Sequence, residues 1–131
     1  MILVRPVVLD ANVLINLIRL NKLDILKNIK GYKFFIPNHV TVEVHKRTQR
    51  LQIHKAFKEG WIQELEISDL SEIEFYIRYR SRFGQGESAC MAVAESRGWI
   101  VASDDRSVQR EVKKKFGAEK LMSTDILLKF L

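Results

Sequence analysis

The residues of this chain whose types and positions could do chemistry are acidic. Asp10 and the pair Asp104 and Asp105 each follow a predicted strand, Glu43 lies on the helix after another strand, and Glu87 opens a helix after a glycine loop. Because the carboxyl ends of parallel strands lie on one edge of a sheet, we expect these groups to converge. Clustered carboxylates repel one another, and a divalent cation removes that conflict.

The chemistry of these side chains indicates which cation. Sites made only of oxygen ligands favour Mg²⁺ or Mn²⁺ over zinc, which usually takes cysteine or histidine. Such an ion can activate a bound water as a nucleophile and stabilise charge on a phosphate oxygen. Hydrolysis of a phosphodiester bond needs both actions, so the acids predict a metal-dependent phosphodiester hydrolase.

Each acid also has a simpler structural interpretation. Glu87 could complement a helix dipole, Glu43 could form an ion pair within its own helix, and one of Asp104 and Asp105 could cap the next helix. These separate explanations account poorly for four acids at one predicted edge. We therefore expect all of these positions to be metal ligands and catalytic residues.

The first element that must position an acid is a strand followed by a helix. Residues 7–9 are continuously apolar, as in a strand buried on both faces, and the apolar positions in 13–18 fall on one helical face. Asp10 lies between the two elements and could be either a helix cap or a ligand. We predict that Asn12 caps the helix and leaves Asp10 free for metal.

Strands and helices alternate along the rest of the chain. Further strands are predicted at 32–37, 62–67, 99–103 and 121–122. Helices are predicted at 23–29, at 38–58 with a break after about residue 52, and at 68–82, 87–97, 107–116 and 125–131. This order predicts an α/β fold with a mostly parallel sheet covered by helices, and a single domain over residues 1–131. In the helix 68–82 we expect Leu70, Ile73, Ile77 and Tyr76 to face inward.

Composition narrows the class of protein. The chain has 131 residues and a net charge of +6, which suggests an anionic partner such as nucleic acid. Its apolar runs are too short to span a bilayer, and residues 1–4 lack the features of a signal peptide. Cys90 is the single cysteine and cannot form an internal disulfide. We expect a cytoplasmic protein.

Four ordered motifs resemble the signatures of a known family. They are Leu9-Asp10-Ala11-Asn12-Val13-Leu14-Ile15, Pro37-Asn38-His39-Val40-Thr41-Val42-Glu43, Gly86-Glu87-Ser88-Ala89 and Val101-Ala102-Ser103-Asp104-Asp105. In this order they resemble PIN-domain nucleases, in particular the compact prokaryotic kind that includes VapC-type toxins. The likeness covers nearly the whole chain.

The resemblance implies a three-layer α/β/α sandwich, here with about five strands, and cleavage of RNA with Mg²⁺ or Mn²⁺. Asp10, Glu43 and Glu87 match the family's first three acids, and Asp104 or Asp105 the fourth, with the hydroxyl of Ser103 favouring Asp105. Asn12 and Ser103 would not bind the metal themselves but would contact the residues that do. The third acid is often aspartate in the toxin branch, so the Gly-Glu form found here departs from it.

Basic residues surround the predicted acidic centre. We expect Arg80, Arg82 and Arg106 to contact the RNA backbone, because cations hold phosphates while the metal acts on one of them. If the protein is the toxin of a toxin-antitoxin pair, an antitoxin protein would occupy the pocket. The resemblance also implies a homodimer.

Two other functions remain open. The first is a PIN-like module that binds RNA or a protein and no longer cleaves. The second is phosphotransfer through a strand-end aspartate, although Asn12 stands where haloacid-dehalogenase-like phosphatases place their second acid. His39 and His45 are interpreted as structural, because neither pairs with a cysteine or a second histidine at the spacing of a zinc site. Cys90 lies on the packed helix and is interpreted as a core residue rather than a nucleophile.

Overall fold

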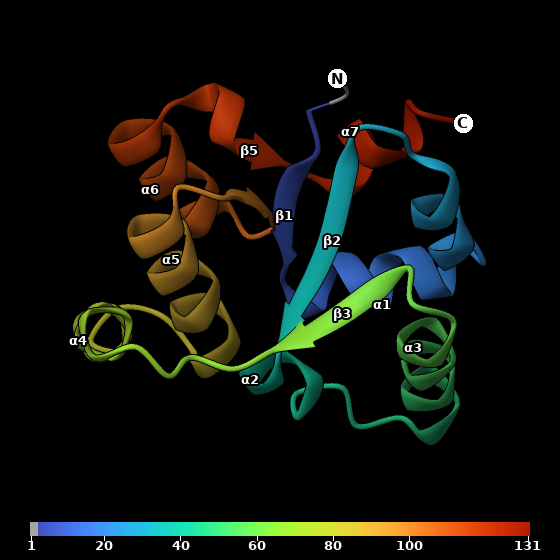
Figure 1. The fold of residues 1–131 in the computed structure, drawn as a ribbon, viewed down its shortest axis with the longest axis horizontal. Helices are drawn as coiled ribbons and strands as arrows, with labels where there is room; N and C mark the ends of the chain where they lie inside the picture. The colour runs from blue at the N-terminus through green and yellow to red at the C-terminus, as the bar shows by residue number, and fades with distance from the viewer. Residues whose placement is uncertain (1–2) are drawn as a thin grey trace.

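The computed structural model describes residues 3–131, so Met1 and Ile2, part of the segment judged not to be a signal peptide, lie outside the described residues. Strands and helices alternate along the chain (Figure 1). The strands are β1 (Arg5–Leu9), β2 (Tyr32–Pro37), β3 (Ile62–Leu65), β4 (Ile100–Ala102) and β5 (Leu121–Met122). The α-helices are α1 (Ala11–Arg19), α2 (Asn38–Thr41), α3 (Arg47–Glu59), α4 (Leu70–Tyr79), α5 (Gln85–Arg97), α6 (Arg106–Phe116) and α7 (Thr124–Leu128), with 3₁₀ turns η1 (Leu23–Asn28) and η2 (Ala118–Lys120).

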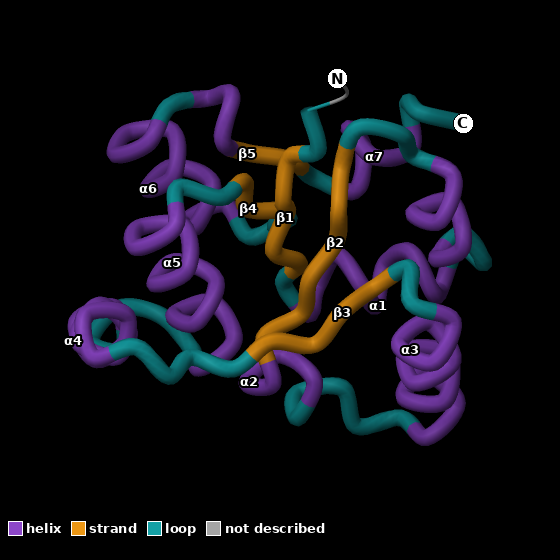
Figure 2. The backbone as a smooth tube through the Cα atoms, viewed as in Figure 1, coloured by secondary structure: helices purple, strands orange, loops and turns teal. Residues whose placement is uncertain are grey.

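The five strands form one sheet in the order β3-β2-β1-β4-β5, and every neighbouring pair is parallel. Helices α1 and α3 lie on one side of the sheet, and α5 and α6 lie on the other (Figures 1 and 2). The predicted α/β class and three-layer arrangement are therefore confirmed. β3 lies at an edge of the sheet, as its alternating sequence predicted.

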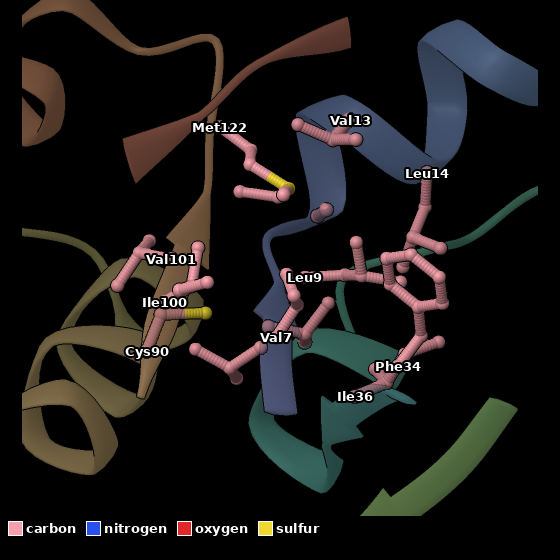
Figure 3. Packing of buried hydrophobic residues seen from close by; sticks show 14 of the residues in the cluster. Val7, Leu9, Val13, Leu14, Phe34, Ile36, Cys90, Ile100, Val101 and Met122 are labelled. Carbon is pink, nitrogen blue, oxygen red and sulfur yellow. The ribbon is translucent and has the colours of Figure 1, made fainter. Parts of the chain in front are cut away.

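The centre of the core is β1, whose last three residues are completely buried. Val7 pairs with Phe34 of β2 on one side and with Ile100 of β4 on the other. Figure 3 shows the side chains of Val7 and Leu9 between those of β2 and β4. Because β1 is fixed by both neighbours and by the two helical layers, the residue that follows it is held in place as well.

The break expected after about Gln52 in the segment 38–58 is misplaced, because it lies earlier in the chain and α3 is continuous through residue 52. α2 ends at Thr41 and α3 begins at Arg47, with a turn and an irregular stretch between them. Glu43 therefore lies in the turn after α2 rather than on a helix. α3 ends at Gly60, whose φ of 85° is the left-handed conformation that glycine adopts most readily.

The orientation predicted for α4 is wrong. Leu70 is 71% exposed and Ile77 is 62% exposed, whereas Glu72 and Tyr79 are buried against the protein. The spacing of the apolar residues predicted that the opposite face of α4 would be buried. That prediction took no account of the ionic partner that allows Glu72 to be buried. Ile73 and Tyr76 are only partly buried.

That partner is Arg97, at the end of α5. Its Nε and Nη2 each donate a 2.8 Å hydrogen bond to the carboxylate of Glu72, and the hydroxyl of Ser96 donates a third bond to Glu72. The side chain of Glu72 is only 2% exposed, so its charge depends on these donors. This pair fixes α4 against α5 across 25 residues of sequence.

Among residues 3–131, no helix is both long and apolar enough to cross a membrane.

The buried pair predicts an asymmetric response to mutation. Arg97→Ala leaves a buried carboxylate without its cation and should lower the free energy of unfolding by about 3 kcal/mol. Lys55→Ala is the matched control, because the Lys55–Glu59 pair is exposed and should contribute less than about 1 kcal/mol. Urea denaturation measures both values, and equal losses would contradict the account.

Candidate active site

The ends of β1 and β4 lie side by side at the point where the order of the sheet reverses. The chain proceeds outward from β1 to β2 and β3, then returns to place β4 on the other side of β1. Ligand sites of open α/β sheets lie outside the carboxyl ends of the strands at such a point. Asp10 follows β1 there, and its N–H donates to the carbonyl of Ala102 at 3.0 Å.

Asp10 is a buried acid, with 2% of its surface exposed. Its Oδ1 accepts a 2.8 Å hydrogen bond from the N–H of Ala11, and its Oδ2 accepts one of 3.0 Å from the hydroxyl of Ser103. The pKa of Asp10 is raised from its usual 3.8 to about 7. Burial is the largest cause, the two hydrogen bonds act against it, and the charges of Glu87 and Glu43 add to the rise. Asp10 is thus a potential metal ligand, and its two hydrogen bonds compensate only part of the effect of burial on its charge.

The prediction that Asn12 caps the first helix is wrong, because Asp10 is the N-cap of α1. The amide of Asn12 instead joins the two strand ends. Its Oδ1 accepts a 3.0 Å hydrogen bond from the N–H of Asp104, and its Nδ2 lies 3.5 Å from Oδ2 of Asp10. Aspartate and asparagine both favour the cap position. Asp10 takes it because α1 begins at Ala11, which places Asn12 inside the helix.

Glu43 contacts the backbone at the start of α5. Its carboxylate accepts a hydrogen bond from the N–H of Gly86. A Cβ at position 86 would lie 2.5 Å from Oε1 of Glu43 and 3.1 Å from Val40. Gly86 was expected in the glycine loop before the helix, but it lies within α5 and leaves room for the carboxylate of Glu43. Sequence reasoning missed this role, which depends on a contact across 43 residues.

Glu87 and Asp105 are further acids of the candidate site, and they lie at the starts of α5 and α6. Glu87 lies in the first turn of α5 and accepts a 3.0 Å hydrogen bond from the N–H of Gly84. Burial raises the pKa of Glu87, as do the charges of Asp105 and Glu43. Hydrogen bonds from Ser107 and from the backbone lower the pKa of Asp105, which caps α6.

The carboxylate of Asp104 has different hydrogen-bond partners from that of Asp105. Its carboxylate accepts hydrogen bonds from Asn16 Nδ2 at 2.7 Å and from the N–H of Thr124 at 2.8 Å. It lines a hollow between α1 and α7 with these same residues. Asn16 was not predicted, although it stands four residues after Asn12 on the same helix. The charge coupling to Glu87 belongs to Asp105 and not to Asp104.

The charges of Glu87 and Glu43 act on Asp10, and those of Asp105 and Glu43 act on Glu87. Among residues 3–131, no group of three or more histidine, cysteine, aspartate or glutamate side chains is already arranged to hold a metal ion. Glu43 and Glu87 each accept a hydrogen bond from a backbone N–H of the glycine segment at the start of α5. The candidate ligand atoms of these acids are all carboxylate oxygens, which suit Mg²⁺ or Mn²⁺.

The geometry can be compared with known proteins. A family model described as a PIN domain matches residues 6–129. The chain belongs to the PIN-domain family. The likeness drawn from the four sequence motifs is thereby confirmed.

Solved structures with this fold include PAE2754 from Pyrobaculum aerophilum. It is 14% identical, with a TM-score of 0.59 over 96% of this chain and 89% of that chain. FitAcB from Neisseria gonorrhoeae is also 14% identical, with a TM-score of 0.45 over 89% of this chain and 95% of that chain. The likeness to PAE2754 concerns the fold alone. No curated protein matches the chain significantly.

The arginines predicted to contact RNA have different surroundings in this PIN domain. Arg80 donates a 2.9 Å hydrogen bond to the carbonyl of Phe83, and Arg82 pairs with Glu111 through two bonds of 3.1 and 3.2 Å. Both are therefore occupied within the chain. Arg106 is exposed in the first turn of α6, next to Asp105.

Of the residues interpreted as structural, Cys90 is buried and His39 is partly buried, whereas His45 is exposed. Cys90 is fully buried, and burial raises the pKa of its thiol well above the usual value, so it is no nucleophile as placed. His39 lies against Tyr76, with ring centroids 4.7 Å apart, and burial lowers its pKa. Its Nδ1 has no hydrogen-bond partner among the described residues.

The raised pKa of Asp10 predicts how stability depends on pH in the metal-free protein. Between about pH 4 and 7 the folded chain holds a proton that the unfolded chain has lost, so stability falls as the pH rises and then levels off. Asp10→Asn removes this decline and should be more stable than wild type by a few kcal/mol at about pH 8, at about 1.4 kcal/mol per pKa unit.

Urea denaturation in EDTA at about pH 4.5 and pH 8 measures this difference. The gain of Asp10→Asn should shrink strongly at the lower pH. Asp24→Asn, at an exposed acid on η1, is the control and should show no such gain. A stability difference between Asp10→Asn and wild type that is the same at both pH values would contradict the account.

Proposed function

We propose that this PIN domain is an endoribonuclease that depends on Mg²⁺ or Mn²⁺. The observation that carries the proposal is Asp10: a buried carboxylate at the switch point of a parallel sheet, with a pKa raised to about 7 and further acids nearby. A perturbed acid in such a position is a strong candidate for a functional site. A cation would neutralise the charge that burial disfavours.

In this proposal Asp10, Glu43, Glu87 and Asp105 hold the metal. Asp104 is assigned a positioning role, because its carboxylate is already occupied by Asn16 and Thr124. When bound, the ion would supply an activated water and stabilise charge on a phosphate oxygen.

Three residues of the chain prepare this site. Ser103 orients Asp10 through its hydroxyl, and Asn12 holds the end of β4 against the end of β1. Gly86 leaves the space that the carboxylate of Glu43 occupies. Asp10 and Glu43 are thus each positioned by a contact from another element, and such contacts orient ligands before a metal binds.

The RNA substrate follows from charge and from the family. The chain carries a net charge of +6 although its candidate centre is acidic, so a polyanion can be attracted to the rim and cleaved at the centre. Arg106 is the best placed cation for phosphate contact, because it is exposed and adjacent to Asp105. Arg80 and Arg82 would need to exchange their present partners.

The proposed function includes a cellular setting for the protein. We propose a single nuclease domain over residues 1–131, acting in the cytoplasm of a prokaryote. A toxin role with a cognate antitoxin at the acidic pocket follows the VapC-like motifs, and the Gly-Glu form of the third acid is where this chain departs from that branch. A PIN-like module that binds without cleaving is the alternative, and it is favoured by the absence, among the described residues, of a ready-made group of three ligands.

Cleavage of structured and single-stranded RNA in Mn²⁺ tests the function and the choice between the paired aspartates. Asp10→Asn and Asp105→Asn should each lower the rate at least about 100-fold, and EDTA should abolish it. Asp104→Asn should retain more activity than Asp105→Asn, because its carboxylate binds protein groups.

The control for this assay is Asp24→Asn, which should cleave like wild type. Circular dichroism of each variant separates loss of chemistry from loss of fold. Equal cleavage by Asp10→Asn, or cleavage in EDTA, would contradict the metal mechanism. RNA binding without cleavage in Mn²⁺ would favour the non-catalytic module.

A further inference from the structure

The segment that contains α3 carries positive charge with almost no compensation. Residues 44–58 include no aspartate or glutamate. The cations of this segment are all exposed, and they are Lys46, Arg47, Arg50, Lys55 and Lys58. In the part of the chain that the structure describes, only one of them belongs to an ion pair, that of Lys55 with Glu59 at 4.0 Å. A surface with charge of one sign attracts a partner of the opposite sign.

Most of these cations lie on one face of α3. They follow one another at steps of three or four residues, which places them along one side of a helix. With a histidine they form a set that we call the α3 stripe, and its members are Arg47, Arg50, His54 and Lys58. The buried residues of α3 lie on another face, and they are Gln49, Ile53 and Ala56. α3 has 13 residues, so the stripe follows a helix about 20 Å long.

The apolar face of α3 is already used by the core of the protein. Ile53 is 1% exposed and Ala56 is completely buried. Leu51 is the single exposed large hydrophobic residue of this helix, every residue of which the structure describes. α3 therefore has no apolar face to insert into a lipid surface or into the groove of a protein. A partner held by a line of charge, such as a sugar-phosphate backbone, fits the stripe instead.

A hollow of about 390 Å³ lies on the first half of the stripe. Its lining contains two arginines and two imidazoles, and the residues are His45, Arg47, Arg50, Leu51 and His54. The ring of His54 packs against Phe57, with ring centroids 5.9 Å apart. Imidazole and guanidinium planes stack on unpaired bases, whereas the bases of a duplex are already stacked on one another. The hollow thus favours a single strand over a duplex.

The path of the chain connects the stripe to the candidate active site. The chain leaves β2 through α2, crosses to the start of α3 and returns along α3 to the start of β3 (Figure 1). Glu43 precedes Arg47, the first residue of α3, by four positions. A strand of RNA bound at the acids can therefore continue over Arg47 towards Lys58. The stripe lies outside the four sequence motifs on which the family resemblance depends.

We propose that the α3 stripe is a second RNA site, separate from the acids, which gives the enzyme a preference for long single strands over short fragments and duplexes. Arg47, Arg50 and Lys58 contact phosphates of the strand. His54 stacks on one of its unpaired bases. The site acts on substrate binding, so its loss raises KM more than it lowers kcat. The effect on cleavage rests on the proposed ribonuclease function, whereas binding of RNA to the stripe can be measured without it.

Fluorescence anisotropy of a labelled single-stranded RNA of about 20 nucleotides, in EDTA, tests the site without cleavage. The double variant Arg47→Glu with Arg50→Glu should weaken binding at least about tenfold and flatten its dependence on salt. The matched control is Lys113→Glu with Lys114→Glu, which changes the net charge equally at two exposed lysines of α6. It should weaken binding less than about threefold. His54→Ala should weaken binding of the single strand and leave binding of a duplex unchanged.

Cleavage in Mn²⁺ then separates the stripe from the acids. Arg47→Glu with Arg50→Glu should raise KM for the long strand at least about tenfold and change kcat far less. The rise in KM should be much smaller for a strand of about four nucleotides, which is too short to lie on both the acids and the stripe. Circular dichroism checks that each variant keeps the fold.

Equal losses of binding in the α3 and α6 variants would overturn the proposal, because net charge alone would then explain them. Unchanged RNA binding in the α3 variant would overturn it as well, and an acidic protein would then be the better candidate for the stripe. A wild type that binds RNA through the stripe and cleaves none would contradict the proposed ribonuclease function but leave the second RNA site in place.

Discussion

The burial of one carboxylate is the constraint on which the rest of this structure depends. Asp10 follows β1, the central strand of the sheet, and is itself 2% exposed, so its charge has lost most of its contact with water. Two hydrogen bonds, from Ala11 and Ser103, compensate only part of that loss, and its pKa rises to about 7. In the proposed function, a bound cation neutralises this charge.

The surrounding elements are arranged to hold that acid and to bring others near it. The reversal of strand order puts β4 beside β1, and Asn12 and Ser103 connect the two strand ends. On the far side of the sheet, α5 brings Glu87 and the Gly86 N–H that binds Glu43. The Glu72–Arg97 pair in turn fixes α4 on α5 and leaves two apolar side chains of α4 exposed.

Local patterns in the sequence predicted the strands and the helices between them, and so the edge at which the acids would lie. They did not predict the cap of α1, because Asp10 and Asn12 are both good cap residues. They also misplaced α4, because its apolar spacing favours one face while an ion pair with a residue 25 positions away fixes the other. The role of Gly86 likewise depends on a distant side chain. Contacts of this kind are set by tertiary structure and have no signal within a short window.

Calorimetric titration of Mn²⁺ into the protein near pH 6.5, in two buffers of different ionisation enthalpy, tests the central claim most directly. If the buried carboxylate of Asp10 is the group that a cation neutralises, wild type should bind Mn²⁺ and release a proton. The variant Asp10→Asn should then lose both the binding and the proton release. Mn²⁺ binding of equal affinity and equal proton release in the two proteins would contradict the account.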